Sequence, residues 1–67
     1  MKVLQIIDAT SGRVWFLNPE HVVGVEGDYD AKFSWVHVTG EFAAIKIEED
    51  VNKAGEGLAR ALRGVDE

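Results

Sequence analysis

Apolar and polar residues follow two different periods along this chain. Between residues 2 and 47, short apolar runs are separated by turn residues such as Gly12, Asn18-Pro19 and Gly40, a pattern typical of β-strands and hairpins. The runs predict strands at residues 2–8, 13–17, 21–26, 33–38 and 42–47. We therefore expect a small antiparallel meander of about five strands, with a strongly curved sheet or a partial barrel.

The period changes at Asp50. Apolar positions then recur at helical spacing, and they are Val51, Ala54, Leu58, Ala61, Leu62 and Val65. Asp50 is a suitable N-cap and Gly64 a suitable C-cap, so the pattern predicts a helix over residues 50–63. The expected fold class is α+β, one domain spanning residues 1–67 with a single C-terminal helix.

The predicted strands carry more apolar side chains than one helix can cover. In residues 13–17, Val14 and Phe16 lie on one side, and Trp15 and Leu17 lie on the other. A strand of an antiparallel sheet that is apolar on both faces is expected to be buried on both.

The fourth and fifth strands repeat this excess. Their aliphatic positions, such as Val36 and Ile45, suit the face that receives the helix, and their aromatic positions lie opposite. A candidate binding or interface face follows, made of Trp15, Leu17, Phe33, Trp35 and Phe42. Three uses stay open: the interior of a small barrel, a subunit interface, or a ligand or partner site with aromatic anchors.

Size and composition narrow these uses. A chain of 67 residues forms a small core, and domains of this size often gain stability from disulfides, metals or oligomerisation. The chain has no cysteine, which removes disulfides and thiolate metal sites. Oligomerisation remains, so we expect a homo-oligomer.

Charge and hydropathy exclude two classes of partner. The net charge of −5 argues against binding to duplex nucleic acid, which requires basic contacts to phosphate. The apolar run near the N-terminus breaks at Asp8, which makes it too short for a signal peptide or a membrane helix. We expect a cytoplasmic protein, in a bacterial cell or a phage-infected host, that does not contact membranes.

The sequence contains no catalytic or metal-binding constellation that we can identify. Ser11 and Ser34 lie outside any nucleophile elbow, and Asp28-Tyr29-Asp30 lacks the remaining ligands of a calcium loop. We expect neither an enzyme nor a cofactor. Scattered cations could still contact an anionic, nucleotide-like ligand, and the candidates are Arg13, Arg60 and Arg63.

Several short motifs carry a family resemblance. They are Gly12, Trp15-Phe16-Leu17-Asn18-Pro19, Val22, Val25, Glu26, Val38-Thr39-Gly40 and Ile45-Lys46-Ile47-Glu48. In this order, residues 3–62 resemble the FlbD/SwrD family of small flagellar and swarming-motility proteins, and similar small phage-encoded proteins. The resemblance implies a non-enzymatic accessory protein without catalytic residues.

Two functions are therefore expected, in order. The first is a non-enzymatic, homo-oligomeric binding or adaptor protein that modulates a protein complex through its aromatic strand face. The alternative is a phage-encoded counter-defence protein that sequesters a nucleotide immune signal or inhibits a host defence protein.

Overall fold

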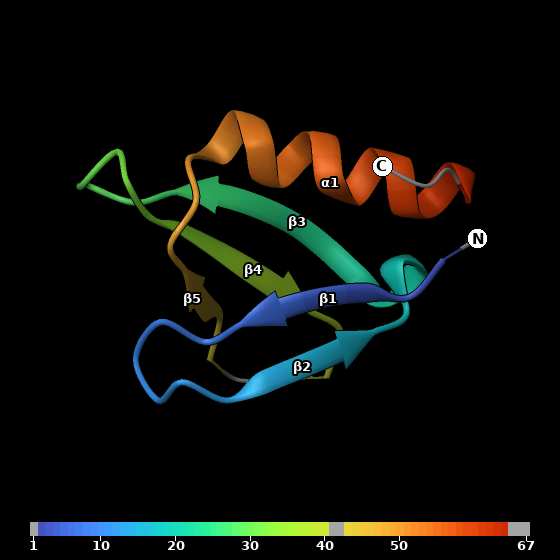
Figure 1. Cartoon of the computed structure of the whole chain (residues 1–67), viewed down its shortest axis with the longest axis horizontal. Coiled ribbons are helices and arrows are strands. Elements are labelled where there is room, and N and C mark those ends of the chain that lie inside the picture. The colour runs from blue at the N-terminus through green and yellow to red at the C-terminus, as the bar shows by residue number, and fades with distance from the viewer. Residues whose placement is uncertain (1, 41–42, 65–67) are drawn as a thin grey trace.

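The computed structural model describes residues 2–40 and 43–64, and these form two antiparallel sheets and a C-terminal helix (Figure 1). The element bounds are β1 Leu4–Ile7, β2 Val14–Leu17, β3 Val22–Gly27, β4 Ser34–Val38, β5 Ile45–Ile47 and α1 Val51–Arg63. Strands β1 and β2 form a hairpin, and β3, β4 and β5 form the second sheet in that order. The predicted α+β class is confirmed, with its antiparallel strands and C-terminal helix.

The strands do not close into a barrel within the described residues. The two sheets approach each other where the backbone N–H of Ala9 donates to the carbonyl of Lys46 at 2.7 Å. Beyond that point β1 and β5 do not pair. The structure is therefore a small antiparallel meander whose five strands divide into a hairpin and a three-stranded sheet.

The start of β3 differs from the prediction because of a local turn. The side chain of Asn18 accepts a hydrogen bond from the amide of Glu20 at 3.0 Å, and Pro19–His21 forms a 3-10 turn. His21 belongs to this turn, and β3 begins at Val22. Pro19 is buried, so the Asn-Pro step contributes to packing as well as ending β2.

A bulge interrupts β3. Val22 pairs with Val38 and Gly24 pairs with His37, which leaves Val23 as the extra residue. A glycine inside a strand often marks a bulge, and the register shift lies next to Gly24. Val23 is consequently turned outward and is 72% exposed.

The core lies between α1, the sheet and the hairpin. Helix α1 runs along one side of the three-stranded sheet, and the hairpin lies below it in Figure 1. The buried apolar residues are Ile6, Val36, Ile45, Ile47, Ala54 and Ala61. Alternation within the strands produces this core, since Val36, Ile45 and Ile47 occupy the aliphatic face that the sequence assigned to the helix.

The ends of α1 have the expected caps. The Asp50 side chain accepts from the amide of Lys53 at 3.0 Å, and Gly64 adopts a left-handed conformation with φ 73°. A second anchor lies next to the N-cap, where the hydroxyl of Ser34 in β4 donates to the carbonyl of Glu49 at 2.6 Å. This bond ties the segment before α1 to the central strand.

Candidate functional site

An aromatic cluster occupies the side of the three-stranded sheet that faces away from the core. It consists of the aromatic residues Phe33 and Trp35 with the charged residues Asp28 and Lys46 beside them. All four are partly exposed, and we call this surface the Trp35 face. Trp35 is paired with Lys46 of β5, so their side chains leave the sheet on the same side. Ser34 and Val36 flank Trp35 in β4, and both are buried on the opposite side of the sheet. Strand alternation thus creates the face and the core together.

The indole of Trp35 is held by a carboxylate. Its Nε1–H donates to Oδ1 of Asp28 at 2.7 Å. Asp28 also accepts from the amide of Asp30 at 3.1 Å. The indole bond, then the backbone bond and the nearby charge of Lys46, lower the pKa of the Asp28 carboxyl below its ordinary value of 3.8. The hydrogen bond to Asp28 therefore restrains the orientation of the Trp35 ring.

A lysine lies over the aromatic rings. The Nζ of Lys46 is 4.5 Å from the ring centroid of Phe33 and 5.6 Å from that of Trp35. Both distances are within the range of a cation–π interaction. The face accordingly combines aromatic surface with one held positive charge.

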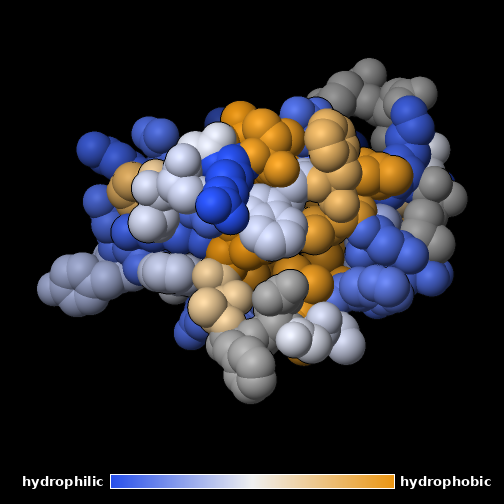
Figure 2. All heavy atoms as spheres, turned by 90° about the horizontal axis from the view of Figure 1, so that it is seen from below, coloured by the Kyte–Doolittle hydropathy of each residue, from blue (hydrophilic) through white to orange (hydrophobic). Residues whose placement is uncertain are grey.

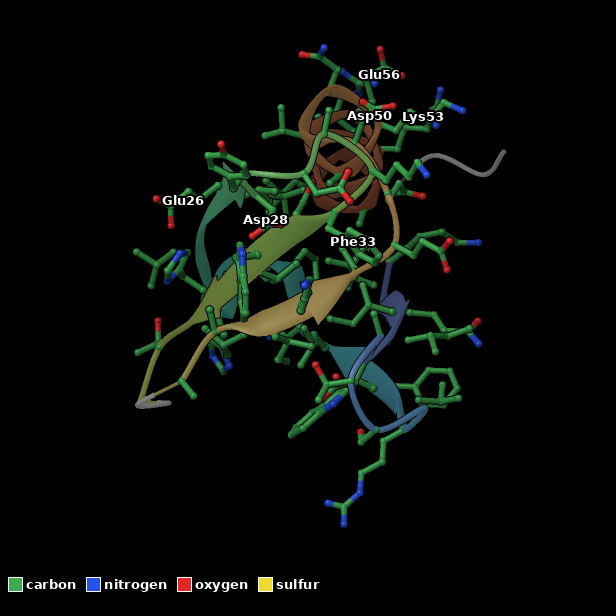
Figure 3. All side chains as sticks on the ribbon, turned by 90° about the vertical axis from the view of Figure 1, so that its left-hand side faces the viewer. Glu26, Asp28, Phe33, Asp50, Lys53 and Glu56 are labelled. Atoms are coloured by element: carbon green, nitrogen blue, oxygen red, sulfur yellow. The ribbon has the colours of Figure 1, made fainter. Side chains whose placement is uncertain are left out.

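Glu26 and His37 border this cluster. Glu26 is the β3 neighbour of Trp35 in the register, and its Oε1 lies 3.0 Å from Nε2 of His37. Figure 3 shows Glu26 and Asp28 on the same side of the sheet, with Asp50 at the N-cap of α1 and Lys53 and Glu56 on the helix. The border of the Trp35 face thus adds hydrogen-bonding groups beside the rings.

The five residues of the sequence-predicted face do not lie together. Phe33 and Trp35 belong to the Trp35 face, whereas Trp15 and Leu17 are partly buried and pack against the core from the hairpin. The buried Nε1 of Trp15 has no hydrogen-bond acceptor among the described residues. Phe42 lies outside the described residues. Alternation gave the correct side of each strand, but it did not tell which sides of separate sheets would meet.

The three predicted arginines also lie apart within one chain. Arg13 follows the hairpin turn, whereas Arg60 and Arg63 lie in the last turns of α1, at the other end of the molecule (Figure 1). Nη2 of Arg60 is 4.0 Å from Oε2 of Glu56. An anionic ligand that used all three would have to bridge more than one copy.

A groove that the sequence did not predict runs between β1 and α1. Its volume is about 710 Å³. Apolar residues including Ile6 and Val36 line its floor, and Lys53, Glu56 and Arg60 of α1 line its rim. The three rim residues are spaced three and four apart, which places them on one side of a helix. The spacing of these three charged residues was the signal in the sequence for the rim of the groove. The same spacing is also typical of an ordinary solvent-exposed helix face.

Acidic residues near the Trp35 face are occupied by structural hydrogen bonds. Asp28 and Asp30 accept the amides of Asp30 and Lys32 at 3.1 and 3.0 Å, respectively. Within residues 2–40 and 43–64, no group of three or more His, Cys, Asp or Glu side chains is arranged to hold a metal ion. The described helix is too short and too polar to cross a bilayer.

Comparisons of the chain with protein-family models, with curated proteins and with solved structures found no match.

Proposed function

We propose that this chain is a small non-enzymatic binding protein, homo-oligomeric and cytoplasmic, that modulates a protein complex through its Trp35 face. The observation that carries the proposal is the indole of Trp35, partly exposed on the sheet and fixed by Asp28 at 2.7 Å. The resemblance to the FlbD/SwrD family supports the same class of accessory function.

Preorganisation is the physical reason for choosing this face. Tryptophan contributes large contact area in protein interfaces and is enriched among their energetic centres. A side chain that is already held loses less conformational freedom on binding. Lys46 and Glu26 then offer a positive and a negative group on either side of Trp35, which gives a partner polar groups to recognise.

Affinity capture from the host, with quantification by mass spectrometry, tests the proposal. We expect proteins that are enriched with the wild-type chain to be lost with Trp35→Ala and retained with Tyr29→Ala. Tyr29 is the matched control because it is a fully exposed aromatic residue in the adjoining loop. Equal capture by the two variants, with both folded by circular dichroism, would show that Trp35 does not contact the partner.

The alternative function is a phage-encoded counter-defence protein that sequesters a nucleotide or inhibits a host protein. Its support is limited to Arg13, Arg60 and Arg63, which would have to converge across copies. Calorimetric titration with mono-, di- and cyclic nucleotides tests it. Stoichiometric binding that is lost in Arg13→Ala would favour this function, and absence of heat would favour the adaptor.

A further inference from the structure

The outer surface of the β1–β2 hairpin is apolar and uncovered. Directly opposed residues of an antiparallel pair share a face, and Ile7 is opposite Val14 while Gln5 is opposite Phe16. Of these, Ile7, Val14 and Phe16 are 57%, 50% and 69% exposed. Figure 2, viewed from the side of β2, shows apolar residues gathered over this part of the molecule.

The backbone of β2 also has an unpaired edge. The amide of Asp8 donates to the carbonyl of Arg13, so hydrogen-bonded positions alternate from that pair along the hairpin. Trp15 and Leu17 therefore exchange bonds with β1, and the N–H and C=O groups of Val14 and Phe16 point away from it. Within residues 2–40 and 43–64, β2 has no strand on that side.

Natural edge strands usually carry features that prevent pairing with another chain. These features include charged residues, proline, bulges and a covering loop or helix. Val14–Leu17 contains no charged residue, proline or glycine, and its register with β1 shows no bulge. The edge is thus suited to receive one more strand.

The chain exposes more surface than is usual for a folded monomer of its size. A folded monomer of 7.4 kDa exposes about 4,200 Å² by the usual scaling with size. The chain exposes 4767 Å². The excess is about 550 Å² per copy, so the chain has enough exposed surface to bury the roughly 1,000 Å² in total that a specific interface between two copies requires.

We propose that two copies associate through antiparallel pairing of their β2 strands, which forms a four-stranded sheet in the order β1-β2-β2-β1. The two-fold axis passes through Trp15. The outward-pointing groups of Val14 then bond those of Phe16 in the second copy, and the side chains of these two residues lie opposite each other on the apolar face. This inference specifies the homo-oligomer of the proposed function and is independent of the Trp35 face.

Charge substitutions at the two opposed positions test the register. Val14→Lys and Phe16→Glu should each weaken self-association at least tenfold, measured by sedimentation, because each puts a charge against an apolar residue. Their equimolar mixture should recover a dimer of mixed composition, because the introduced lysine of one copy would face the introduced glutamate of the other. Val23→Lys is the control, since it charges another exposed valine on β3. The wild-type dimer should have twice the 7.4 kDa chain mass.

Amide hydrogen exchange followed by NMR tests the pairing without any substitution. The Val14 and Phe16 amides should exchange slowly in the dimer and quickly on dilution, whereas the Trp15 amide should be slow in both because it bonds within the hairpin. A wild-type monomer at millimolar concentration would overturn the inference, as would a dimer with rapidly exchanging Val14 and Phe16 amides. If Trp35→Ala halves the mass, copies meet at the Trp35 face and the inference is wrong.

The same measurements separate this inference from the proposed function. Loss of partner capture in Trp35→Ala with an unchanged dimer mass supports the binding function, whatever the state of β2. A dimer that persists in Phe16→Glu contradicts β2 pairing and leaves the result at Trp35 unaffected.

Discussion

The hydrogen bond between β4 and the segment before α1 provides the sharpest stability test. Ser34 is fully buried, and its hydroxyl donates to the carbonyl of Glu49 at 2.6 Å. Ser34→Ala removes the hydroxyl donor, so the carbonyl of Glu49 loses this hydrogen bond. The loss of such a bond costs about 1–2 kcal/mol when the remaining group is partly buried. A chain of this length has a total stability of only about 3–10 kcal/mol.

Chemical and thermal unfolding followed by circular dichroism measure this cost. We expect the urea midpoint of Ser34→Ala to fall with an unchanged m-value, and the melting temperature to drop by about 4–8 °C per kcal/mol. Ser11→Ala is the matched control, because this serine is exposed and its Oγ accepts a 3.3 Å bond from the amide of Arg13. The control should change stability by no more than about 0.5 kcal/mol.

Equal stability of the two serine variants would refute the reasoning. It would mean that α1 is held to the sheet by apolar packing, with no measurable contribution from the Ser34 bond. The result is informative in either direction, because Glu49 is adjacent to the N-cap Asp50. A coupled loss in the double variant Ser34→Ala/Asp50→Ala would show that both bonds hold the same helix end.

The remaining predictions concern the titration of Asp28 and the substitution of two glycines. The folded pKa of Asp28 lies below 3.8, so the stabilising contribution of its carboxylate is complete above pH 3.8 and is lost as the pH falls through the folded pKa. The Nε1–H resonance of Trp35 should report this titration. The Trp35→Phe variant should return the pKa of Asp28 toward 3.8. An unchanged pKa in that variant would contradict the assigned cause. Gly55→Ala should stabilise the chain by up to about 1 kcal/mol, because an added Cβ meets no atom within 4 Å in α1. Gly12→Ala should destabilise it because Gly12 has φ +79°, and denaturation curves in which both variants shift in the same direction would contradict this reading.

Local features of the fold were readable from the sequence because they depend on residues close in the chain. The Asp50 and Gly64 caps of α1, the bulge beside Gly24 and the end of β2 at Asn18 all arise from backbone constraints within a few residues. The strand ends were less well predicted. His21 belongs to the 3-10 turn because Asn18 caps that turn, and a side-chain bond of this kind competes with strand pairing.

The candidate site was readable in part. Alternation correctly assigned Trp35 and Phe33 to the side of the sheet opposite Val36. It could not reveal the hydrogen bond from Trp35 to Asp28. Asp28 lies in the loop between β3 and β4, and strand alternation does not determine where a loop side chain points. Nor could it foresee the position of Lys46 over both rings, which requires the pairing of β4 with β5.

The sequence by itself determined which side chains share each face of each strand, and where the helix begins and ends. Only the tertiary structure decided which faces meet. Trp15 and Phe16 are neighbours in one apolar strand, yet Trp15 packs against the core and Phe16 is 69% exposed. The physical reason is that side-chain direction follows from backbone periodicity, whereas burial depends on how two separate sheets pack around a single helix.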